Sequence, residues 1–137
     1  LGFVGENYGG YIFPDFLPAF DGMFSIVKML EMLAILDTNL HDILRQIPVT
    51  YILKQIVPCP WESKGKVMRF LVENTSNLNV ELIDGIKIWE EDGWCMAIPS
   101  PDKAYFNVIA ESYEKRKAEL FLENIIELVN KGIGGLK

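Results

Sequence analysis

The chain has 137 residues, half of them apolar and 12% aromatic, and its 13 basic and 19 acidic side chains give a net charge of −6. This composition supplies a hydrophobic core and excludes a disordered chain, while the acidic balance argues against nucleic acid or an anionic membrane as partner. Two cysteines and one histidine exclude a disulfide framework and a common zinc motif, so we expect reduced thiols in a cytoplasmic protein.

The first ten residues, LGFVGENYGG, contain four glycines and predict a loop. A short apolar strand is expected at 11–13, ended by Pro14, followed by a connector over 15–21. The chain opens inside this loop with Leu1 and shows no signal peptide. We therefore expect it to be a piece of a longer protein.

A helix is predicted over 22–36, where only Ser25, Lys28 and Glu31 form a polar stripe. Because the other positions are almost all apolar, the helix is expected to be buried on most sides. It is shorter than the roughly 20 residues that a membrane span needs. So small a chain cannot cover it, which implies a larger parent or an oligomer. The polar break at 37–39 marks the predicted domain boundary.

Beyond the break, the pattern predicts a small antiparallel sheet with two helices on one face, an α+β architecture. Asp84-Gly85 and Asp92-Gly93 are dipeptides typical of hairpin turns. Ser63 is expected to cap one helix and Gly132 to end another. Expected strands cover 49–57, 80–83, 86–89, 94–98 and 106–110, and expected helices cover 41–46, 64–74 and 113–131.

Three stretches, in order, resemble the α-D-phosphohexomutases, the family of phosphoglucomutases and phosphomannomutases. The first, 5–14, is similar to their sugar-binding loop and the strand behind it. The other two, 84–94 and 99–100, are similar to the last domain, where an Asp-Gly-Trp turn precedes a phosphate loop of the form Arg-Pro-Ser-Gly-Thr-Glu-Pro. The resemblance implies that 1–38 ends the third, α/β domain. It implies that 39–137 is the complete fourth domain, which is TBP-like.

The resemblance also implies where a phosphosugar would bind in the first loop. Gly5 and Glu6 match the family pattern, and Glu6 would contact the sugar. Its two carboxylate oxygens suit vicinal hydroxyl groups. Tyr8 stands where the family has a serine and is included as a substrate-binding candidate. The alternative for this stretch is a glycine-rich turn with a solvated glutamate.

The second loop departs further from the family pattern. The family's arginine falls at Ile98, its glycine at Pro101 and its threonine at Asp102. A phosphate site uses backbone N–H groups, hydroxyls and a guanidinium, so these changes weaken it. Ser100 and Lys103 are the remaining phosphate-binding candidates. An ordinary turn is the alternative for this loop.

No residue of this chain matches the phosphoserine or the aspartate-rich magnesium loop of the family, so no catalytic residue is assigned. Since phosphoryl transfer needs a nucleophile and a cation, the chain alone is expected to be inert. The phosphoserine and Mg²⁺ would come from the remaining domains of the parent, the expected partners of this chain. The competing hypothesis is a regulatory or scaffolding protein that has the mutase fold and no mutase activity.

Two other groups of side chains have two interpretations each. The acidic run at 90–92 could bind a cation, or it could be a charged hairpin tip. Trp61, Trp89 and Trp94 could stack on a sugar, but Trp89 and Trp94 flank a turn, where tryptophans are more often cross-strand partners.

Overall fold

The computed structural model describes residues 2–6 and 9–135. The chain divides into two compact units, Leu1–Ile47 and Pro48–Lys137. This division lies after the domain boundary predicted at 38/39, because the short helix α2 (Leu40–Leu44) groups with the first unit. The assignment of 1–38 and 39–137 to the third and fourth mutase domains stays a prediction.

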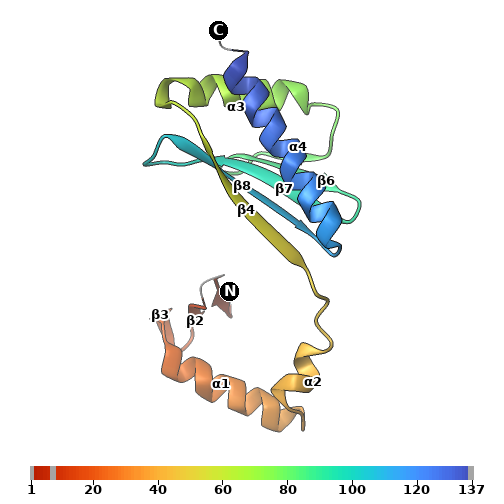
Figure 1. Ribbon diagram of the computed structural model, residues 1–137. Helices are drawn as coiled ribbons and strands as arrows, with labels where there is room; N and C mark the ends of the chain where they lie inside the picture. The colour runs from red at the N-terminus through yellow and green to blue at the C-terminus, as the bar shows by residue number, and fades with distance from the viewer. Residues whose placement is uncertain (1, 7–8, 136–137) are drawn as a thin grey trace. The chain divides into compact units, whose positions relative to one another are not determined.

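The first unit holds a small antiparallel sheet and a helix (Figure 1). The strands β1 (Val4–Gly5), β2 (Tyr11–Phe13) and β3 (Leu17–Phe20) pair in that order and precede α1 (Gly22–Ile35). The strand β3 lies inside the segment predicted as a connector. Pro18 suggested a break there, but β3 is an edge strand, where a missing N–H need not cost a ladder hydrogen bond.

The helix α1 begins where its sequence indicates, and its apolar surface is exposed. The Asp21 carboxylate accepts a hydrogen bond from the Phe24 N–H at 2.8 Å, which caps the helix. Within the first unit the expected burial on most sides is absent: no α1 residue is buried, and Met23 is 82% exposed. The unit contains only three short strands and α2 besides, too little surface to cover this helix. Among the described helices, none combines the length and hydropathy of a bilayer span.

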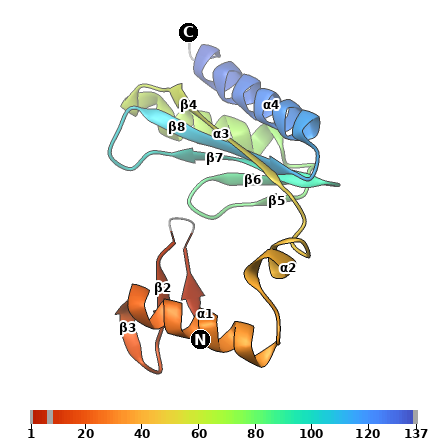
Figure 2. The same ribbon diagram turned by 60° about the horizontal axis from the view of Figure 1, so that its bottom comes forward.

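The second unit is a five-stranded antiparallel sheet with two helices on one face, as predicted (Figure 2). The strand order is β4-β8-β7-β6-β5. The strands are β4 (Tyr51–Pro58), β5 (Val80–Glu81), β6 (Ile86–Glu90), β7 (Gly93–Pro99) and β8 (Tyr105–Ser112). The helices are η1 (Trp61–Ser63), α3 (Lys64–Asn74) and α4 (Lys115–Gly134).

The core of this unit lies between the sheet and the two helices. Along β8 every second residue is buried, because side chains alternate between the faces of a strand. Phe106, Val108 and Ala110 point into this layer and are fully buried. The helices contribute Val67 and Leu71 from α3 and Ile125 and Val129 from α4.

Two predicted helix ends differ from the structure. Gly132 lies inside α4 and is buried, rather than ending the helix. A Cβ atom there would lie 3.1 Å from the Phe70 ring and 3.2 Å from Val67 Cγ1, so this glycine lets α4 approach α3 closely. Ser63 precedes α3 but makes no side-chain capping bond, because it already has helical backbone angles at the end of η1.

Candidate functional site

The first candidate loop is a tight connection between β1 and β2. The Glu6 N–H donates to the Gly10 carbonyl at 3.0 Å, and the Gly9 N–H donates to the Glu6 carbonyl at 3.1 Å. Gly9 has φ of 89°, a conformation that favours glycine. A Cβ atom on Gly10 would lie 2.9 Å from Glu6 Oε1, so the carboxylate rests against this glycine. Gly5 and Glu6 are exposed. Tyr8 lies outside the described residues.

The second candidate loop joins β7 to β8 and is closed by backbone hydrogen bonds. The Ser100 N–H donates to the Tyr105 carbonyl at 3.0 Å, and the Tyr105 N–H donates to the Lys103 carbonyl at 2.9 Å. From outside the loop, the Cys59 N–H donates to the Ala104 carbonyl at 2.9 Å. This loop therefore has a defined shape, anchored on the segment that follows β4.

The two predicted phosphate-binding residues have different surroundings in this loop. Ser100 is buried, and its hydroxyl donates to Asp102 Oδ1 at 2.9 Å. Lys103 is exposed, and no carboxylate in the described part of the chain lies within ion-pair distance of it. An incoming phosphate would meet a free ammonium at Lys103 and would compete with Asp102 for the Ser100 hydroxyl.

Sequence reasoning missed Lys64, which contacts this loop from behind. Its side chain is buried, and Nζ donates to the Ser100 carbonyl at 2.7 Å and also to the Lys103 carbonyl. The ammonium lies 3.6 Å from the centre of the Trp61 ring, a cation–π distance. No local pattern separates this lysine from its exposed neighbour Lys66, since both occupy the first turn of α3.

The charge of Lys64 also reaches a buried thiol. Burial raises the pKa of Cys59, and the nearby Lys64 ammonium partly opposes that rise. Both Cys59 and Cys95 are free and buried. The expectation of thiols without a disulfide framework therefore agrees with the structure.

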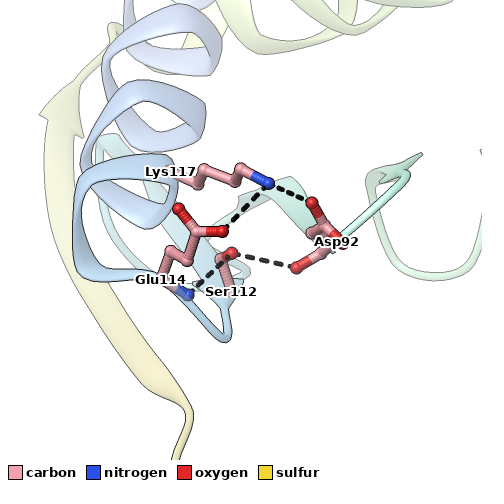
Figure 3. Close-up of polar contacts among 4 residues, drawn as sticks. All are labelled: Asp92, Ser112, Glu114 and Lys117. Atoms are coloured by element: carbon pink, nitrogen blue, oxygen red, sulfur yellow. Dashed lines mark hydrogen bonds and ion pairs between the residues drawn. The ribbon is translucent and has the colours of Figure 1, made fainter.

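The other end of the sheet carries a polar network that connects the β6–β7 hairpin to the start of α4 (Figure 3). Lys117 pairs with Asp92 and, at 3.2 Å, with Glu114. The Ser112 hydroxyl donates to the Asp92 carbonyl at 2.9 Å and accepts the Glu114 N–H at 3.3 Å. Hydrogen bonds to Asp92 and then Glu114 raise the pKa of Lys117. These contacts assign Asp92 to a structural hairpin tip.

A cavity of about 330 Å³ lies beside this network and includes the two tryptophans considered for sugar stacking. Trp89 and Trp94 are directly paired across β6 and β7, as the cross-strand interpretation predicted. The Lys87 ammonium lies 3.7 Å and 4.4 Å from their ring centres. The chain's own lysine thus lies over one face of each ring. Across residues 2–6 and 9–135, no three His, Cys, Asp or Glu side chains are placed to hold a metal ion.

Comparisons with known proteins point to one family. Residues 1–51 match the profile described as phosphoglucomutase/phosphomannomutase, alpha/beta/alpha domain III. The chain is 34% identical over 98% of its length to phosphoglucosamine mutase of Methanocaldococcus jannaschii. It is 34% identical over 96% to that of Methanococcus vannielii, and 31% identical over 96% to a probable phosphoglucosamine mutase of Pyrococcus furiosus. It spans 31%, 30% and 30% of the lengths of these three relatives.

Proposed function

Because this chain is related over nearly its whole length to the C-terminal part of the α-D-phosphohexomutases, we propose that it binds the phosphosugar in such a mutase. The substrate class is a hexose phosphate. A glucosamine phosphate is the first candidate, because the relatives are phosphoglucosamine mutases. The observation that carries the proposal is the match to phosphoglucosamine mutase over 98% of the chain, a share that includes both candidate loops.

In this proposal Glu6 binds sugar hydroxyls. Its carboxylate is exposed and held beside Gly10 by the hydrogen-bonded turn. Two acceptor oxygens on one carboxylate match two neighbouring hydroxyl donors. Gly5, which has no side chain, would let the sugar approach the backbone. Tyr8 would be the third substrate-binding residue of this loop.

The loop 99–105 binds the phosphate group in the same proposal. Lys103 supplies a free positive charge, and Ser100 supplies a hydroxyl once it releases Asp102. Closure of the terminal domain over a bound phosphosugar would exclude water from the reacting group.

The proposal assigns the phosphoryl-transfer groups to other parts of the longer protein. The family is associated with Mg²⁺, but the described residues offer no ligand set that fits a metal. The phosphoserine and Mg²⁺ would therefore come from the remaining domains. We accordingly expect no mutase turnover by this chain on glucosamine phosphate with added magnesium. Measurable turnover would contradict this assignment.

A second candidate function is a mutase-fold protein without mutase activity, serving in regulation or scaffolding. The observation that favours it is the 2.9 Å hydrogen bond from Ser100 to Asp102, which places a carboxylate beside the hydroxyl that should meet phosphate. Pro101 also removes one N–H donor from the loop. Like charge repels like, so Asp102 lowers phosphate affinity.

Calorimetry on the whole chain separates the two functions. We expect glucosamine 6-phosphate to bind more tightly than glucosamine, and Ile98→Arg with Pro101→Gly to raise that affinity further. Leu120→Arg, on the exposed side of α4, is the charge-matched control and should leave affinity unchanged. Equal affinity for sugar and phosphosugar, with no gain in the double variant, would overturn phosphate binding and favour the non-catalytic protein.

A further inference from the structure

We propose that Lys64 is the positioning residue of the phosphate loop: its buried ammonium holds the Ser100 and Lys103 carbonyls and so directs the Ala104 N–H, next to the free N–H groups of Asp102 and Lys103, to the side where an anion binds. This inference rests on the proposed function, that the loop 99–105 receives the phosphate of a phosphosugar. It goes further by naming how a loop without the family's arginine would hold that phosphate.

The burial of Lys64 is the first observation. Its exposed fraction is 8%, and lysines are almost never this buried unless they are paired. No carboxylate in the described ranges lies within 4.0 Å of the ammonium. Two backbone carbonyls and the face of Trp61 take the place of a counter-ion. A positive charge without a counter-ion therefore lies directly behind the loop.

The direction of the loop's peptide groups is the second observation. The carbonyls of Ser100 and Lys103 accept from Lys64, and that of Ala104 accepts from the Cys59 N–H. In a trans peptide, C=O and N–H point in opposite directions, so the Ala104 N–H is directed away from Lys64. The Ser100 carbonyl precedes Pro101, which has no N–H, so the contact with the Lys103 carbonyl is the one that orients a donor, the Ala104 N–H.

The N–H groups on that other side are available to a ligand. Within the part of the chain that the structure describes, the N–H groups of Asp102, Lys103 and Ala104 donate to no protein acceptor. All three residues are exposed. Consecutive free N–H groups of this kind form an anion-binding concavity.

Charge and geometry therefore act together on the same ligand. The Lys64 ammonium is buried, so its attraction for an anion is less screened by solvent than that of an exposed lysine. Lys103 is exposed, and the three free peptide N–H groups belong to this lysine and to its two neighbours in sequence. This arrangement supplies positive charge that Ile98, in place of an arginine, cannot supply.

The test uses inorganic phosphate as the probe and the full chain, labelled with ¹⁵N. Wild type should show its largest amide shifts at residues 102–104, with affinity measured by calorimetry. Lys64→Met keeps the side-chain length but removes the charge and the donors, and should weaken phosphate binding at least about tenfold. Lys64→Arg should stay within about threefold of wild type, because it keeps charge and donors. Lys66→Met, on the exposed side of the same helix turn, should match wild type.

The outcomes separate this inference from the proposed function. No phosphate binding by wild type overturns the proposed function itself. Binding by wild type together with an unchanged affinity of folded Lys64→Met overturns only the role of Lys64. If Lys64→Met does not fold, Lys64→Gln, which is shorter and uncharged but polar, takes its place: binding weakened at least about tenfold supports the inference, and an affinity within about threefold of wild type overturns it.

Discussion

Replacing Gly93 by alanine should separate two central strands of the second unit. Gly93 opens β7 and lies opposite Ser112 on β8. A Cβ atom there would lie 2.0 Å from the Glu111 carbonyl oxygen and 3.1 Å from Ser112 Cα. Both neighbours are backbone atoms and cannot rotate away, so the strands must move apart at this end. The requirement for glycine is steric, because Gly93 is not among the residues with positive φ.

The cost follows from the contacts that must be disrupted. Inserting one methyl group into a packed site costs about 1–3 kcal/mol, and a lost ladder hydrogen bond adds about 1 kcal/mol. The expected loss of unfolding free energy is therefore about 2–4 kcal/mol. In a domain of this size each kcal/mol lowers the melting temperature by about 4–8 °C, so we expect a drop of at least about 10 °C.

Gly65→Ala is the matched control, with the opposite expected sign. Gly65 lies in the first turn of α3, where an added Cβ would meet nothing within 4 Å. Alanine is favoured over glycine in a helix by about 0.5–1 kcal/mol, so this variant should be slightly stabilised.

Urea and thermal unfolding followed by tryptophan fluorescence measure both variants. All three tryptophans, at 61, 89 and 94, lie in the second unit, so the signal reports on that unit. Circular dichroism checks the result, because Trp94 adjoins the substituted residue. A Gly93→Ala midpoint equal to that of wild type, or below it by less than the Gly65→Ala shift, would refute the steric argument.

Two further predictions concern titrating groups. Burial, and then the charge of Glu90, raise the pKa of Cys95 to about 12, so its thiol should react with a disulfide reagent only after unfolding. A raised pKa stabilises the fold fully below the unfolded pKa of about 8.5 and less as pH rises toward 12. Urea midpoints should therefore fall more between pH 8 and 10 for wild type than for Cys95→Ala, and equal falls would contradict this. Lys117→Met should lower the midpoint, in a salt-sensitive way, more than Lys115→Met, because Lys115 has only one partner at 3.8 Å. The pKa of Lys117 is also raised, so its contribution to the free energy of unfolding is complete below about pH 10 and is lost as the pH rises further. If the two variants behaved identically, the network of Figure 3 would not be the source of this contribution.

The α+β architecture of the second unit followed from local sequence. Phe106, Val108 and Ala110 alternate with less buried residues, and this period of two predicts a strand whatever the rest of the chain does. Asp92-Gly93 predicted a hairpin, and the hairpin is there, with residues 91–92 as its turn and Gly93 paired with Glu90. Those signals reside in neighbouring residues, so they can be found without a structure.

Other features contradicted the local signal because distant residues decide them. Pro18 suggested a connector, but it lies in an edge strand, and only the pairing order reveals the edge. Gly132 suggested a helix end, but it serves the contact with Phe70. The apolar pattern of α1 predicted burial, but burial requires a covering surface, which this unit does not supply.

The candidate site shows the same separation between local and tertiary information. The sequence alone determined the glycine-rich turn at Glu6, the Ser100 loop and the family resemblance, because these depend on residues next to one another. Only the tertiary structure decided that Lys64 is buried while Lys66 is exposed. The reason is physical: the carbonyls that hold Lys64 belong to residues 36 and 39 positions further along the chain, and folding alone brings them to it.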